Sequence, residues 1–175
     1  WDLPWMPWDG CELYVADLGR DGTLGDPVRM AGQDGVEAIW QPEWSPDGDL
    51  VFASDRSGWW NLERIHGVQR SVLHEAEAEF GYPAWVFGLR SFAFLGDGRI
   101  VCCYESRGRT HFAILDTGSG ELEPLDLGVD ALWGSPSVSA EGSTVLLVAG
   151  TAAVPNHVLL VDLEDGTLRR VLRRS

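Results

Sequence analysis

The sequence has 175 residues, 45% of them hydrophobic, and a formal net charge of -14. A chain of this length and hydrophobicity can bury a core of its own, which excludes a disordered tail and a mini-protein held together by disulfides. The negative charge argues against nucleic acid as a partner, because phosphate binding needs clustered positive charge. No apolar run reaches the length of a membrane span, so we expect no membrane partner either.

Two sequence markers return along the chain at intervals of 44 to 50 residues. The first is an apolar segment that ends in a polar residue, at residues 13–17, 62–66, 112–116 and 158–162. The second is a tight-turn dipeptide followed by an apolar strand, at Asp47-Gly48, Asp97-Gly98 and Glu141-Gly142. Two markers that keep one spacing predict an internal repeat.

Each repeat has the size of one propeller blade, because four short antiparallel strands fit into about 45 residues. Helical repeats of similar length would show a 3.6-residue periodicity, which is missing here. Residues 72–80 are interpreted as a strand followed by a loop into the next blade. The sequence therefore predicts an all-β partial β-propeller of about three and a half blades, each a four-stranded antiparallel sheet. We expect a single propeller fragment over residues 1–175, with a half blade at 1–32 and blades at 33–78, 79–128 and 129–175.

A closed propeller typically has at least four blades, so this chain would leave open sheet faces by itself. Two explanations follow from the predicted strands. The sequence is a piece of a longer protein, or copies associate to complete the ring. Two copies would supply about seven blades, so a homo-oligomer that closes the ring is one expected partner arrangement.

The cysteines and histidines predict neither a disulfide framework nor a metal site. Three cysteines, two of them adjacent, indicate free thiols in a reducing, cytoplasmic compartment. Neighbouring residues of a strand face opposite sides, so the thiols of Cys102 and Cys103 should point apart. The four histidines lack companions at metal-ligand spacing, and we expect no metal and no cofactor.

Several motifs resemble known propellers. The segment Trp44-Ser45-Pro46-Asp47-Gly48 is similar to the WD40-like repeat of TolB-type proteins. A wider set resembles the N-terminal propeller of prolyl oligopeptidase (S9) family enzymes, in the acylaminoacyl-peptidase and dipeptidyl-aminopeptidase-like branch. This set comprises residues 6–10 (MPWDG), 41–48 (QPEWSPDG), 54–62 (SDRSGWWNL), 79–81 (EFG) and 85–89 (WVFGL).

The resemblance implies a serine peptidase, a hydrolase whose catalytic α/β-hydrolase domain follows the propeller. In that family the propeller restricts entry to short peptides, so the implied role of this segment is gating of substrate access and packing on the hydrolase domain. The sequence contains no G-x-S-x-G nucleophile elbow, and no catalytic residue is assigned to it. The alternative is a stand-alone TolB-like binding or scaffold propeller, completed by homo-oligomerisation.

The candidate substrate-binding residues are Arg56, Trp59 and Trp60, which flank a glycine turn between the second and third strands of a blade. Loops at propeller ends commonly form binding surfaces. Exposed indoles and a guanidinium could hold an aromatic or carboxylate-bearing peptide by stacking and charge-assisted hydrogen bonds. The alternative is that at least one of the two tryptophans packs between blades.

Overall fold

A computed structural model describes residues 1–131, 138–163 and 167–174. These residues form fourteen β-strands and contain no helix. Within this part of the chain, no helix is long and apolar enough to cross a membrane.

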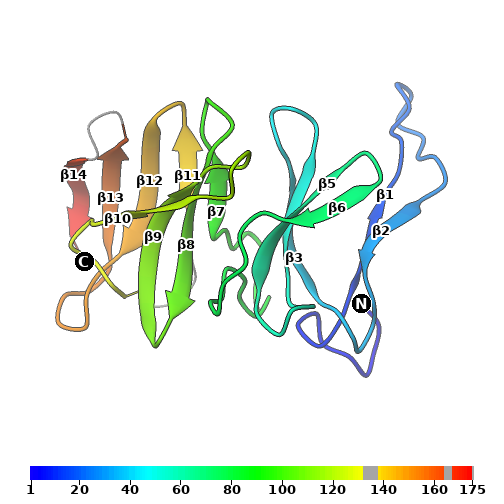
Figure 1. Ribbon diagram of the computed structural model, residues 1–175, viewed down its shortest axis with the longest axis horizontal. Coiled ribbons are helices and arrows are strands. Elements are labelled where there is room, and N and C mark those ends of the chain that lie inside the picture. Colours follow the sequence, from blue (N-terminus) through cyan, green and yellow to red (C-terminus); the bar gives the residue numbers. More distant parts are fainter. Residues whose placement is uncertain (132–137, 164–166, 175) are drawn as a thin grey trace.

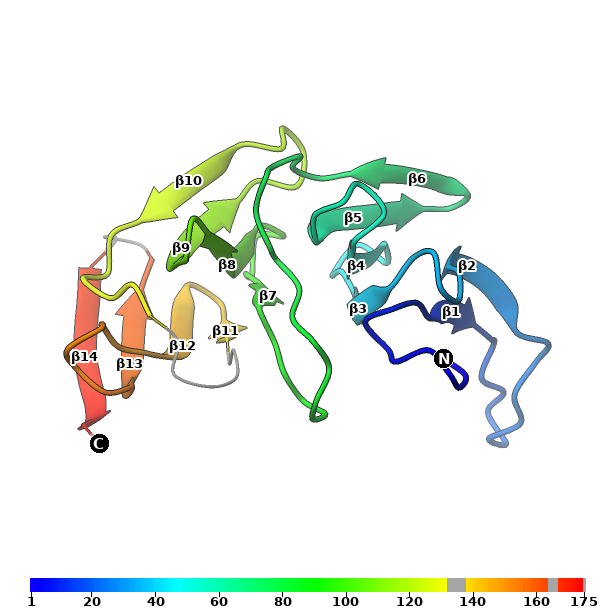
Figure 2. The same cartoon turned by 90° about the horizontal axis from the view of Figure 1, so that it is seen from below.

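The strands form four antiparallel sheets that follow one another along an open arc (Figures 1 and 2). The first sheet has two strands, β1 (Glu12–Val15) and β2 (Val28–Gly32). The second sheet contains β3 (Ile39–Trp44), β4 (Leu50–Ser54), β5 (Asn61–His66) and β6 (Gln69–Val72). The third contains β7 (Phe92–Phe94), β8 (Ile100–Ser106), β9 (Arg109–Leu115) and β10 (Leu122–Leu125). The fourth contains β11 (Val138–Glu141), β12 (Thr144–Ala149), β13 (His157–Asp162) and β14 (Thr167–Arg174).

The predicted fold class is confirmed, because one two-stranded sheet is followed by three four-stranded antiparallel sheets whose strands pair in chain order. Figure 2 shows β6 and β10, the last strands of the second and third sheets, on the convex side of the arc. The first strands of the three four-stranded sheets, β3, β7 and β11, lie toward its concave side. This is the radial arrangement of propeller blades.

The repeated turn has one geometry in the second and third sheets. The Ser45 N–H donates to the Asp49 carbonyl at 2.7 Å, and the Leu95 N–H donates to the Arg99 carbonyl at 2.7 Å. Gly48 lies at a φ of 86°, a left-handed conformation that glycine adopts without steric cost. The repeated Asp-Gly dipeptide therefore marks the same tight turn in both sheets.

The core is divided among the spaces between neighbouring sheets, because the second and third sheets each bury both of their faces. Phe52 packs toward the first sheet, whereas Val51 packs toward the third. In β8, Cys102 belongs to the core between the second and third sheets, and Cys103 belongs to the core between the third and fourth. The two thiols therefore lie on opposite faces, as predicted, and both are free.

Residues 72–80 are the end of a strand followed by a loop, as the sequence predicted. Of residues 72–80, only Val72 lies in a strand, and residues 73–91 form the connection. The Asn61 side chain binds the backbone of this connection just after the sheet ends. Its Oδ1 accepts from the Ala76 N–H at 2.7 Å, and its Nδ2 donates to the Ala76 carbonyl at 3.0 Å, so a side chain satisfies backbone groups here.

Candidate functional site

The candidate site lies at one end of the second sheet. Because neighbouring strands run antiparallel, the β4–β5 loop (residues 55–60) and the exit from β6 lie at the same end. Figure 1 places the N-terminal segment at this end as well. The structure thus groups the loop that contains Arg56, Trp59 and Trp60 with the β6–β7 connection.

Arg56 is tied to a buried carboxylate. Its Nε donates to Glu63 Oε1 at 2.8 Å, with 45% of the Arg56 side chain and 1% of the Glu63 side chain exposed. Part of the guanidinium charge is therefore compensated within the protein. Arg56 is poorly suited to be the free cation that a peptide carboxylate would require.

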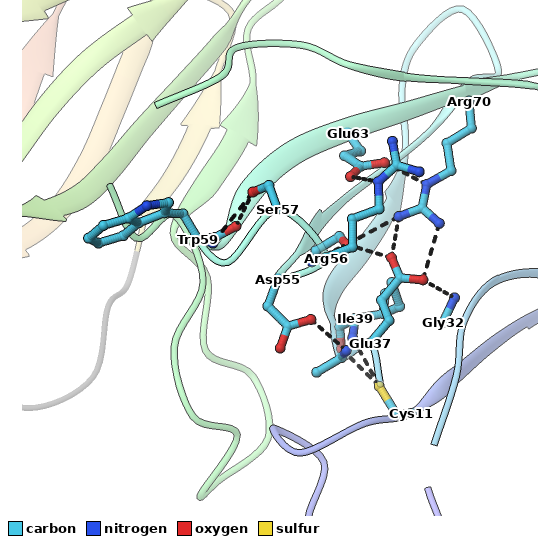
Figure 3. Close-up of polar contacts among 12 residues, drawn as sticks. Cys11, Gly32, Glu37, Ile39, Asp55, Arg56, Ser57, Trp59, Glu63 and Arg70 are labelled. Carbon is cyan, nitrogen blue, oxygen red and sulfur yellow. Dashed lines mark hydrogen bonds and ion pairs between the residues drawn. The ribbon is translucent and has the colours of Figure 1, made fainter. Parts of the chain in front are cut away.

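Glu63 and Arg56 belong to an ion cluster that also includes Glu37, Arg70 and Ser54 (Figure 3). Arg70 Nε donates to Glu63 Oε2 at 2.5 Å, and the same guanidinium donates to both oxygens of Glu37. The Ser54 hydroxyl donates to Glu37 Oε1 at 2.5 Å. Arg70 Cζ also lies 5.2 Å from the centre of the Phe52 ring, so its guanidinium has a cation–π contact.

The ion cluster joins the first sheet to the second. Glu37 Oε2 accepts from the Gly32 N–H at 3.1 Å at the end of β2, while Glu63 and Arg70 lie on β5 and β6. Burial by itself would raise the pKa of Glu37, but hydrogen bonds from Arg70 and Ser54 outweigh it and lower the pKa. The cluster therefore holds its charges in fixed pairs, which is typical of a structural network.

Neighbouring contacts fix the start of the β4–β5 loop. The Ala38 N–H donates to Asp55 Oδ1 at 2.8 Å, and the Cys11 thiol donates to the Ile39 carbonyl at 3.3 Å. Burial raises the pKa of the Asp55 carboxyl and of the Cys11 thiol. The loop thus begins from an anchored base.

Trp60 occupies the packing position that the sequence left as an alternative. It is partly buried and packs against the core between the second and third sheets. A Cβ on Gly81 would lie 2.5 Å from the Trp60 ring, so glycine is needed at position 81 for the close approach. The Trp60 N–H donates to Glu79 Oε2 at 2.9 Å, and its carbonyl accepts from the Phe80 N–H at 2.7 Å.

Trp59 has the opposite environment. Its side chain is 39% exposed, and Figure 3 shows the indole pointing away from the ion cluster. It lines a surface cavity of about 320 Å³ with Ser57, Glu75, Ala76 and Glu77. Two carboxylates beside an indole suit a cationic or hydrogen-bond-donating group better than a carboxylate.

Of the three predicted residues, the structure therefore brings only Trp59 into the lining of this cavity. Substrate binding by Arg56, Trp59 and Trp60 remains a prediction. Among the described residues, no group of three or more His, Cys, Asp or Glu side chains could hold a metal ion.

Sequence reasoning missed the ion cluster and an exposed aromatic loop in the β6–β7 connection. Glu63 and Ile65 are two residues apart on β5 and share a face, which could have placed the Glu63 carboxylate on a buried face. Arg70 and Glu37 offered no comparable signal, because their partners come from three separate segments. The exposed loop contains the consecutive apolar residues Trp85-Val86-Phe87, a pattern that the sequence alone does not distinguish from a buried strand.

The sheets, the turn register and the packing between the sheets define a partial β-propeller. Similar solved structures confirm the predicted resemblance to the propeller of S9 peptidases. No protein-family model matches the chain, and no curated protein sequence matches it significantly.

Similar solved structures exist. The chain is 35% identical to a puromycin hydrolase, with a TM-score of 0.87 over 100% of this chain and 26% of that one. It is 34% identical to a puromycin-hydrolyzing peptidase of Mycobacterium tuberculosis, with a TM-score of 0.89 over 99% of this chain and 26% of that one. Dipeptidyl peptidase 4 of Porphyromonas gingivalis matches at 11% identity and a TM-score of 0.69, over 96% of this chain and 23% of that one, and shows the fold alone. The chain spans about a quarter of the length of the puromycin hydrolases it matches.

Proposed function

We propose that this chain is the non-catalytic propeller segment of an S9-type serine peptidase, which gates substrate access and packs on an α/β-hydrolase domain. The main support is the similarity to two puromycin-hydrolysing enzymes over essentially the whole chain, at 34% and 35% identity. The part of those enzymes that matches contains no more than 26% of their length. The absence of a G-x-S-x-G elbow from this sequence is consistent with a catalytic serine elsewhere.

We further propose that the parent enzyme hydrolyses short aminoacyl amides, with puromycin as the first substrate to test. Puromycin joins an amino acid to an aminonucleoside through an amide bond. The cavity beside Trp59 supports this proposal, because Glu75 and Glu77 could attract the protonated amine of such a substrate on its way to the hydrolase domain. The propeller would act on access and selection, while the chemistry takes place outside this chain.

The test is a kinetic assay with the full-length protein that contains residues 1–175. We expect hydrolysis of puromycin and of short aminoacyl amides, with little activity on long peptides. Absence of any amide hydrolysis by the folded full-length protein would contradict the peptidase assignment. Equal rates on short and long peptides would contradict the gating role alone.

A stand-alone TolB-like binding or scaffold propeller is the second candidate. Its support is the propeller fold together with a sequence that has no catalytic motif. The gene sequence beyond Ser175 distinguishes the two candidates, because a G-x-S-x-G domain favours the peptidase and further blades alone favour the scaffold. If two copies close the ring, light scattering of this chain should give the mass of a dimer, and a monomer would contradict that arrangement.

A further inference from the structure

The β6–β7 connection contains a loop of consecutive exposed apolar side chains, here called the aromatic loop (residues 84–88). Trp85 is 73% exposed, Val86 is 55% exposed and Phe87 is fully exposed. Single exposed apolar residues are common on protein surfaces, but a contiguous group of them marks an interaction site. The three side chains contribute little to the cores that the sheets enclose.

The base of the aromatic loop is anchored on both sides. The Trp85 ring lies 4.3 Å from the Trp8 ring of the N-terminal segment. Arg90 donates to Glu43 Oε2 at 2.7 Å, and the Ser91 N–H donates to Gln41 Oε1 at 2.7 Å. The protein therefore presents Phe87 from a supported position.

The position and shape of the aromatic loop favour a protein partner. Figure 2 shows the β6–β7 connection extending to the concave side of the arc, away from outer strands β6 and β10. The Trp59 cavity lies at the same end of the second sheet. A projecting aromatic side chain cannot enclose a small ligand, which needs a concave site, but it can insert into a pocket of another protein surface.

We propose that the aromatic loop docks into the catalytic domain of the parent peptidase, with Phe87 as the inserted side chain. This inference rests on the proposed function. About three quarters of each puromycin-hydrolysing relative lies outside the part that matches this chain, so a large neighbouring structure exists in those proteins. Further blades of the same chain, or a second copy that closed the ring, would instead meet the terminal sheets, β1–β2 and β11–β14, at the two ends of the arc.

Site-specific photo-crosslinking in the full-length protein tests this inference. Phe87 is replaced by p-benzoylphenylalanine, which keeps an aromatic ring at the position, and the crosslinked peptides are identified by mass spectrometry. Val68 provides the matched control, because it is 99% exposed but lies in the β5–β6 turn at the opposite end of the same sheet. We expect position 87, and not position 68, to crosslink within one chain to the peptides of the hydrolase domain.

Three outcomes would overturn the inference: crosslinks from position 87 to a second copy or to further blades, crosslinks confined to residues 1–175, or a yield no higher than at position 68. Puromycin hydrolysis by the same preparations separates this result from the proposed function. An active enzyme without the expected crosslink refutes only the docking of the aromatic loop. A full-length protein that lacks a hydrolase domain refutes the proposed function itself.

Discussion

The ion cluster between the first two sheets gives the sharpest test of the packing described here. Substitution of Arg70 by Met removes the guanidinium that donates to Glu63, Glu37 and Ser54, while an unbranched side chain remains over Phe52. Only 1% of the Glu63 side chain and 12% of the Glu37 side chain are exposed, so their carboxylates would lose a partner that water cannot readily replace.

Removal of one partner from a buried ion pair costs about 3 to 5 kcal/mol. We expect the lower end, about 3 kcal/mol, because Arg56 still neutralises Glu63 and 19% of the Arg70 side chain is already exposed. For a protein of this size, that loss corresponds to a decrease of about 6 to 12 °C in melting temperature.

Urea unfolding followed by tryptophan fluorescence measures this loss, with Arg99→Met as the matched control. Arg99 pairs with Asp97 at 2.8 Å, but 39% and 53% of the two side chains are exposed, so its loss should cost less than about 1 kcal/mol. Equal destabilisation by Arg70→Met and Arg99→Met would refute the reasoning, because burial of the partners would then have no effect.

Three further predictions concern the packing and ionisation of single side chains. Trp60→Ala should lower the unfolding free energy by about 2 kcal/mol and Trp59→Ala by less than about 1 kcal/mol, since only Trp60 packs against the core. A urea-unfolding experiment that gives the reverse order would be inconsistent with this placement. Because the folded-state pKa of Glu37 is lowered, its contribution is complete above the unfolded pKa of about 4.3 and is lost as the pH falls further. The stability difference between the natural protein and Glu37→Gln should therefore shrink below about pH 4, and a difference that grows there in acid unfolding would contradict the sign of the shift. Burial raises the pKa of the Cys102 thiol, and it raises the pKa of the Cys103 thiol to about 12. Neither thiol should therefore react with a disulfide reagent at about pH 8 before the protein unfolds. Rapid modification of the folded protein would contradict their burial.

The fold could be predicted because the information is local and repeated. Asp47-Gly48 and Asp97-Gly98 specify tight turns at one spacing, and the strands that follow them are apolar enough to be buried on both faces. Alternation along a strand was sufficient to place Cys102 and Cys103 on opposite faces. These features depend on neighbours a few residues away.

The site could be predicted only in part, because its contacts join distant segments. Nothing near Arg56 in the sequence indicates that Glu63 and Arg70 bind each other and that Arg70 also reaches Glu37, 33 residues away. The different environments of Trp59 and Trp60 depend on the close approach of Gly81 from the next connection. Such distinctions require the three-dimensional arrangement.

Labelling of the full-length protein with a fluorophosphonate probe, followed by peptide mapping, tests whether this chain is the non-catalytic part of a serine peptidase. We expect one modified serine, located outside residues 1–175, and no modification of this chain when it is treated alone. Modification of a serine within residues 1–175 would contradict the assignment of this chain as a non-catalytic propeller segment. A folded full-length protein that is not labelled at all would contradict the assignment of that protein to the serine peptidases.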